Sequence, residues 1–335
     1  MLPIVTPSPR ENSILIGQDN AERAVLEALA GGRLHHAWLI TGPEGVGKAT
    51  LAYRFARRLF AGGAAASLDM AATHPVFRRV AMGSHADLLT VEREWDEKKK
   101  RMKKNIAAET VRQIPGFLHL TPAEGGWRVV IVDGAEDMNA HSANALLKVL
   151  EEPPSRAVLM LISATPGRLL PTIRSRCRHL ALDSLSQADL LRTLALYLPD
   201  LSPTEAQRLA ALADGSPGRA LALAEQGGLL IGALVEEVLA GLPHFPTLRA
   251  YEMADKLKEE TAFELFFSLL RASIANALAA TLRNSADSAQ RSLIAQRDVP
   301  AWGALWARLG ELQRDANQHN LDRRQAVVAG LSLLR

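Results

Sequence analysis

Residues 42–49 read Gly-Pro-Glu-Gly-Val-Gly-Lys-Ala, between an apolar run at 37–41 and a helical pattern at 49–60. A Gly-x-x-x-x-Gly-Lys frame at a strand-to-helix junction is typical of a phosphate-binding loop (P-loop), whose backbone N–H groups converge on phosphate oxygens. The lysine is placed to neutralise a terminal phosphate. The candidate nucleotide-binding residues here are Gly42, Gly45, Gly47 and Lys48.

The position directly after Lys48 lacks the hydroxyl that a hydrolytic site needs. A P-loop that works with Mg²⁺ has Ser or Thr there as a metal ligand, whereas this chain has Ala49. Thr50 lies one residue further on, about 100° around the helix, and so points elsewhere. The loop therefore predicts a P-loop fold without ordinary Mg²⁺ binding.

A second candidate position is Asp133, which ends the apolar run at 129–132. A carboxylate at the end of a neighbouring strand can hold Mg²⁺, although it can equally cap the segment that follows. Hydrolytic relatives carry a second acid directly after it to polarise water, and this chain has Gly134 there, with Glu136 two residues further on. Losing the metal-binding hydroxyl and the water-activating acid together predicts loss of hydrolysis.

Three runs are apolar at both odd and even positions, namely 37–41, 129–132 and 158–162. This pattern is typical of parallel strands covered by helices on both faces. Their alternation with helical patterns predicts an α/β domain over 1–183. Alanine and leucine dominate afterwards and no strand-like run follows, so all-helical domains are expected over 184–236 and 237–335. The expected helices there include 186–197, 203–213, 218–226, 263–282, 299–314 and 321–334.

Charge and composition narrow the setting. A net charge of +3 and a pI of about 9.1 mildly favour a polyanionic partner. The charged run at 92–104 is expected as a solvated helix or loop, with a phosphate-facing patch as the alternative. Cys177, the single cysteine, excludes an internal disulfide and is expected as a buried thiol.

The first residues have no secretory-signal pattern, and no apolar stretch reaches the ~18 residues that a membrane span needs. A cytoplasmic protein without a membrane partner is expected.

The segment Pro171-Thr172-Ile173-Arg174-Ser175-Arg176-Cys177 follows the strand at 158–162. An arginine projecting from such a domain is either simply solvated or acts as a finger that stabilises phosphoryl charge in a neighbour's site. The residues alone leave both readings open.

Three segments together resemble the clamp-loader family of AAA+ proteins, and within it the delta-prime branch of bacterial DNA polymerase III subunits. They are HHAWLITGPEGVGKATLA at 35–52, SANALLKVLEEPP at 142–154 and LLPTIRSRC at 169–177. The resemblance extends over about 14–225, and LEEPP with SRC at this spacing is specific, whereas the glycine loop by itself is not.

The resemblance implies a RecA-like AAA+ domain, a helical lid and a helical collar, in a five-membered ring with delta and gamma/tau subunits. Such a ring opens the sliding clamp and places it on primed DNA. It implies that Arg176 is the arginine finger, that Ser175 and Cys177 are framework positions, and that the chain's own nucleotide site has decayed. The chain is thus expected to be a non-hydrolysing stator, with its DNA contacts made to the backbone.

Two further departures from the family pattern stand out. Many relatives carry a four-cysteine zinc module, but 60–85 contains no cysteine, and His74 and His85 alone cannot build a tetrahedral site. No zinc or other cofactor is therefore expected, although weak ATP or ADP binding stays open. Active relatives have a lid arginine where this chain has Gly218, and Arg219 is offset by one position.

Three alternatives remain. The first is an active gamma/tau-type motor, which Ala49 and Gly134 disfavour. The second is a free-standing P-loop enzyme acting on a small molecule, which requires the missing metal site. The third is a plain DNA-binding adaptor, which the basic residues at 98–104 permit but no recognition-helix signature supports.

Overall fold

The computed structural model describes residues 6–32, 34–62, 66–97, 101–124 and 126–335. The chain separates into two compact units, one of Met1–Asp200 with Asp214–Arg219, the other of Leu201–Ala213 with Ala220–Arg335. The first unit holds a parallel sheet with helices on both faces, and the described residues of the second form helices and loops without a strand. The predicted fold class is thereby confirmed, whereas the division at 183 and 236 stays a prediction.

Five parallel strands in the order β2-β5-β6-β1-β7 form the sheet of the first unit. Three of them are the predicted apolar runs, each matched to within one residue at either end. The strands are β1 (Ala37–Thr41), β2 (Leu88–Val91), β5 (Arg128–Asp133), β6 (Ala157–Ser163) and β7 (Arg178–Ala181). Strand β6 therefore lies between the P-loop strand β1 and the strand that ends in Asp133.

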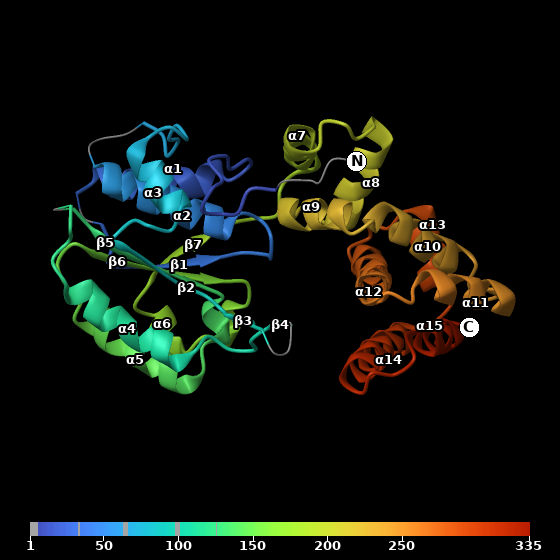
Figure 1. Ribbon diagram of the computed structural model, residues 1–335. Helices are drawn as coiled ribbons and strands as arrows, with labels where there is room; N and C mark the ends of the chain where they lie inside the picture. The colour runs from blue at the N-terminus through green and yellow to red at the C-terminus, as the bar shows by residue number, and fades with distance from the viewer. Residues whose placement is uncertain (1–5, 33, 63–65, 98–100, 125) are drawn as a thin grey trace. The chain divides into compact units, whose positions relative to one another are not determined.

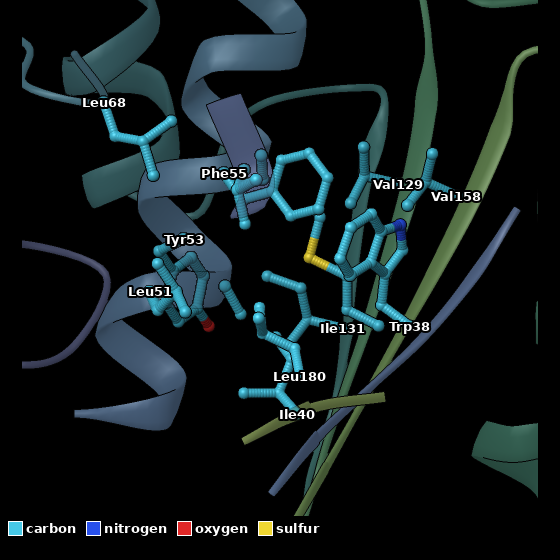
Figure 2. Packing of buried hydrophobic residues seen from close by; sticks show 14 of the residues in the cluster. Trp38, Ile40, Leu51, Tyr53, Phe55, Leu68, Val129, Ile131, Val158 and Leu180 are labelled. Carbon is cyan, nitrogen blue, oxygen red and sulfur yellow. The ribbon is translucent and has the colours of Figure 1, made fainter. Parts of the chain in front are cut away.

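Alternate residues of each strand enter two separate cores, because successive side chains of a strand point to opposite faces. On one face Trp38 and Ile40 pack with α1 (Asp19–Ala30), α2 (Lys48–Ala61) and α3 (Pro75–Ala81) (Figure 1). Figure 2 shows this core, with Trp38 beside Phe55 of α2. On the other face Ala37 and Leu39 pack with α4 (Ala108–His119), α5 (Ala140–Glu151) and α6 (Pro171–Arg174). Burial on both faces explains the continuous apolar runs in the sequence.

Two buried arginines of α2 hold the chain that precedes α1 against this helix. The guanidinium of Arg54 donates to the carbonyl of Ser13, and that of Arg57 donates to the carbonyl of Asn12 at 2.6 Å. Arg54 also pairs with Glu22 of α1 at 2.7 Å. Burial, together with the charge of Arg54, lowers the pKa of Arg57 to about 10. These contacts hold residues 10–13 in place. Leu15 follows this segment and lies against Gly47 of the P-loop.

The charged run at 92–104 contains a short antiparallel hairpin. Strands β3 (Trp95–Asp96) and β4 (Arg101–Met102) pair with Trp95 opposite Met102, and residues 98–100 between them lie outside the described residues. The expectation of a helix or loop is therefore wrong for these strands, because cross-strand pairing stabilises the extended backbone. Both paired side chains are exposed, as expected for a solvated segment.

A long apolar helix, α12 (Glu260–Leu282), packs against α10 (Gly228–Ala240), α13 (Ser288–Ile294), α14 (Val299–Gln318) and α15 (Arg323–Leu333) of the second unit. By length and composition it is the only described helix that could cross a membrane. The core helix of a soluble protein can be equally long and apolar, and α12 carries the charged residues Glu264 and Arg271 within its apolar sequence. The remaining helices of the chain are α7 (Gln187–Tyr197), α8 (Pro203–Ala213), α9 (Pro217–Glu225) and α11 (Thr247–Lys256).

A buried ion pair joins the strands β2 and β5 where they begin. Asp87, directly before β2, lies 3.4 Å from the guanidinium of Arg128, and both side chains are buried. The carboxylate of Asp87 also accepts the N–H groups of Ala123 at 2.8 Å and Glu124 at 3.2 Å. Arg128 in turn donates to carbonyls of residues 120 and 121, so this pair fastens the loop that leads into β5.

The substitution Asp87→Ala is expected to lower the free energy of unfolding by about 3 kcal/mol, since it leaves Arg128 buried without its counter-charge. Urea unfolding followed by circular dichroism measures this. Glu109→Ala is the matched control, because that carboxylate is exposed beside an exposed Arg112, and it should change stability by less than about 0.5 kcal/mol. Equal unfolding midpoints for the two variants would contradict the assignment.

Candidate functional site

The carboxyl ends of β1, β5 and β6 meet at one edge of the sheet, which brings the P-loop and Asp133 together as predicted. Lys48 begins α2 directly after the loop, and its charge acts on Asp133. Arg176 does not belong to this group. Arg176 lies two residues before β7, which begins at Arg178. Because Arg178 pairs with Trp38 near the beginning of the parallel strand β1, Arg176 lies near the opposite edge of the sheet, where the strands begin.

The P-loop lysine is bonded to its own loop. The Nζ of Lys48 donates to the carbonyl of Gly42 at 2.7 Å and to that of Pro43 at 2.6 Å. Burial lowers the pKa of the ammonium, and the charges of Asp133, Glu136 and Glu44 oppose that shift. The cation is thus present in the loop, with its hydrogen bonds directed to backbone carbonyls.

The acidic side of the site is poorly suited to hold a metal ion. Burial, followed by repulsion from Glu92, raises the pKa of Asp133, while Lys48 acts in the opposite direction. The residue that precedes the following short helix is Gly134, which has no side chain to cap it. Because Ala49 has no ligand atom, Asp133 lacks its usual partner, and the residues present do not fit a Mg²⁺–nucleotide complex.

The backbone after Asp133 adopts a conformation that favours glycine at position 134. Gly134 has φ = 74° and ψ = 47°, in the left-handed region where a residue with a side chain is strained. Glu136 does not replace the missing acid, because its Oε1 accepts the N–H groups of Ala164 at 2.8 Å and Thr165 at 3.2 Å. One oxygen of this carboxylate therefore holds the loop after β6, whereas its Oε2 is buried without a hydrogen-bond partner among the described residues.

A second segment of the first unit packs directly on the P-loop. The N–H of Gly218 donates to the carbonyl of Gly45 at 2.9 Å, and the hydroxyl of Ser216 donates to the carbonyl of Glu44 at 2.8 Å. A Cβ on Gly218 would lie 2.9 Å from the Cα of Gly45, so this close approach of two backbones requires glycine. These hydrogen bonds involve no phosphate and close the loop with the chain's own atoms.

The candidate finger, Arg176, is partly exposed, with 36% of its side chain accessible. Its guanidinium donates to the carbonyl of Thr172 at 3.0 Å and pairs with a carboxylate oxygen of Glu151 at 2.8 Å. The neighbouring Ser175 donates its hydroxyl to the same carbonyl at 3.2 Å. The arginine is thus held at the surface by its own turn and by the end of α5.

Cys177 is buried in the core that α4, α5 and α6 form with the sheet, as expected. Burial raises the pKa of its thiol to about 12, so the group stays neutral at physiological pH. The cysteine therefore anchors the turn that carries Arg176 and contributes packing, with no redox partner available in a chain that has one cysteine.

The two histidines weighed as zinc ligands have other contacts. The ring of His74 accepts the N–H of Val76 and so caps the start of α3. The ring of His85 stacks on that of Phe60, with centroids 3.8 Å apart. Among the described residues no group of three or more His, Cys, Asp or Glu side chains is placed to hold a metal ion. That the chain binds no zinc stays a prediction.

Three features of the site escaped the reading of the sequence. Leu15 packs against Gly47 of the P-loop, and Ser216 bonds to the loop from a distant part of the chain. No local pattern marks these residues. The loop after β6 could have been found, because Ser163 ends an apolar run as Asp133 does, and parallel strands end at a common edge.

A P-loop after β1, an acid after β5 and an interposed strand β6 place the first unit among the P-loop proteins of AAA+ type. A comparison of the chain with family models identifies the branch. Residues 17–186, half of the chain, match the family described as DNA polymerase III, delta subunit, and the chain belongs to this family of clamp-loader proteins.

Curated relatives agree with this assignment. The chain is 41% identical over 208 residues to DNA polymerase III subunit delta′ of Pseudomonas aeruginosa, covering 62% of this chain and 61% of that protein. It is 31% identical over 226 residues to DNA polymerase III subunit tau of Escherichia coli, covering 65% of this chain and 33% of tau. The match thus spans less than two thirds of each of these relatives.

Among solved structures, a DNA polymerase III gamma subunit-related protein of Thermotoga maritima aligns over 95% of this chain and 98% of its own, with 19% identity and a TM-score of 0.41. At this TM-score the likeness carries no argument about the site.

The substitution Gly218→Ala is expected to loosen the contact on the P-loop and to lower the free energy of unfolding by about 1–3 kcal/mol, because the added Cβ meets backbone atoms of Gly45. Hydrogen exchange of the amide at position 218 should become faster. Gly116→Ala is the control, since nothing lies within 4 Å of the added atom there and alanine favours the helix. Unchanged exchange in the Gly218 variant would refute the contact.

Proposed function

We propose that this chain is a stator subunit of a replicative clamp loader, hydrolyses no ATP itself, and supplies Arg176 as an arginine finger to the ATP site of a neighbouring gamma/tau-type subunit. The observation that carries the proposal is the position of Arg176 near the edge of the sheet opposite the chain's own P-loop. Strand β1 has five residues, so the two edges are about 15 Å apart. An arginine at that distance serves a phosphate on another subunit and not one on its own.

The non-hydrolysing half of the proposal follows from the P-loop edge. Hydrolysis needs a metal ligand after the lysine and a free acid near the attacking water. This chain has Ala49 and Gly134 at those positions, and Glu136 is bonded to backbone N–H groups. The loop itself is retained because it begins α2 and carries the contacts at Glu44 and Gly45.

The proposed setting comes from the family. The chain would assemble with delta and gamma/tau subunits in a five-membered ring, act on the sliding clamp through that ring, and place backbone contacts on primed DNA in the cytoplasm. Thr110 and Arg112 on α4 are the residues we propose for DNA contact; Arg112 is exposed and Thr110 is half-buried. Such contacts would weaken as salt rises, because they release counterions from the phosphates.

A second candidate is an active motor of the gamma/tau type. It is favoured by one observation, the retained Lys48 in a loop whose glycines are intact. It needs a metal ligand that Ala49 cannot provide, and a nucleotide would have to draw Lys48 away from two carbonyls. Measurements on the isolated chain separate the two candidates.

The substitution Arg176→Ala is expected to leave the ring assembled and to lower its clamp- and DNA-stimulated ATPase. A finger is worth about 10³-fold or more in kcat at the site it serves. If this chain serves one of three motor sites, the ring should lose at least about a third of its turnover, with KM for ATP nearly unchanged. Steady-state ATPase of the reconstituted ring measures this.

Arg192→Ala is the matched control, because that arginine is also exposed and pairs with a carboxylate, Asp189, within its own helix. Its ring should retain wild-type turnover. If the Arg176 variant retains it too, the finger assignment is wrong, whatever the isolated chain does with ATP.

The isolated chain is expected to bind ATP with a dissociation constant weaker than about 0.1 mM, and equally weakly with Mg²⁺ or with EDTA, since no metal ligand follows Lys48. Titration calorimetry measures the affinity, and a phosphate-release assay in magnesium buffer should give no turnover. Micromolar affinity that depends on Mg²⁺, or sustained phosphate release, would favour the motor.

A further inference from the structure

The two glutamates of the LEEPP segment, Glu151 and Glu152, have different surroundings although they are adjacent. Glu151 ends α5, and its carboxylate lies 2.8 Å from the guanidinium of Arg176. Glu152 follows the helix with φ = −124° and an exposed side chain, which has no partner among the described residues. Only the first of the two therefore acts on the arginine.

The contact joins two elements that are far apart in the sequence. Arg176 belongs to the turn between α6 and β7, whereas Glu151 arrives from α5, which packs beside α6. The guanidinium also donates to the carbonyl of Thr172 at 3.0 Å, which is only four residues away along the chain. Without Glu151, this would be the one hydrogen bond among the described residues that holds the long arginine side chain. The carboxylate adds a second, charged contact from a separate, rigid helix, which fixes the direction of the guanidinium.

We infer that Glu151 is a positioning residue for the arginine finger, a role that rests on the proposed function of Arg176. Glu151 holds the guanidinium in one orientation at the surface before the neighbouring subunit arrives. An arginine that is ordered in advance loses less conformational freedom when it meets a phosphate, so its contribution to the transition state is larger.

A carboxylate beside the finger also has an opposing effect, because its charge partly cancels the field of the guanidinium. The pair is half exposed, with 36% of the arginine and 52% of the glutamate side chain accessible, so solvent screens that cancellation strongly. Orientation therefore outweighs neutralisation, and the sign of the effect on turnover is fixed: removing the carboxylate slows the neighbour's ATPase.

The test uses the complete ring, reconstituted with its own delta- and gamma/tau-type subunits, clamp and primed DNA. Glu151→Gln keeps the size of the side chain and removes its charge, and Glu152→Gln makes the same change one residue away. The Arg176-dependent part of the ATPase is the difference between wild type and Arg176→Ala. Glu151→Gln should reduce that part about two- to fivefold, in kcat and not in KM, where fivefold corresponds to about 1 kcal/mol.

The double variant Glu151→Gln with Arg176→Ala distinguishes positioning from a structural role. A positioning residue acts through the arginine, so the glutamine substitution should have no further effect once the arginine is absent. Ring assembly by gel filtration and unfolding by urea should be unchanged in both glutamine variants, since both side chains are exposed.

Three outcomes would overturn the inference: unchanged or faster turnover with Glu151→Gln, an equal loss with Glu152→Gln, or an undiminished loss in the Arg176→Ala background. In each of these cases the assignment of Arg176 as the finger would still hold, provided that Arg176→Ala alone lowers the ATPase turnover of the ring. Wild-type turnover with Arg176→Ala would instead refute the proposed function, and the role of Glu151 with it.

Discussion

The burial of one parallel sheet between two helical layers is the constraint from which the rest of the first unit follows. Both faces of the sheet are covered, so its functional groups can emerge only at the two edges where the strands begin and end. The carboxyl edge carries the P-loop and Asp133, and Arg176 lies near the amino edge. The sheet therefore separates the P-loop from the partly exposed arginine.

At the carboxyl edge, the P-loop holds another segment of the chain, residues 216–218, by hydrogen bonds and close packing. The glycines that would admit phosphate oxygens admit another backbone instead, that of Gly218, and the lysine bonds to carbonyls of its own loop. Buried polar groups need partners, and here carbonyls of the loop pair with Lys48 and with the N–H of Gly218. The glycines of the loop thus also serve packing, so a P-loop frame alone is weak evidence of hydrolysis.

The fold was largely predictable because its signals are local. Continuous apolar runs marked β1, β5 and β6, and the helices α7, α8, α9, α12, α14 and α15 were predicted to within a few residues. The helices α10, α11 and α13 were not predicted. The short strands β3 and β4 were misread, since the dense charge of 92–104 hides the pairing of Trp95 with Met102. The burial of Cys177 was also predicted correctly, whereas nucleotide binding by the P-loop residues stays a prediction.

The sequence by itself determined the P-loop frame, the absence of a hydroxyl at Ala49 and of an acid at Gly134, and the family, because these are properties of residue types at fixed spacing. Only the tertiary structure decided that Glu136 is occupied by the loop after β6, that Gly218 rests on Gly45, and that Glu151 rather than Glu152 holds Arg176. Each of these contacts joins segments that are distant along the chain. Their geometry follows from how the helices pack on the sheet, which no local pattern encodes.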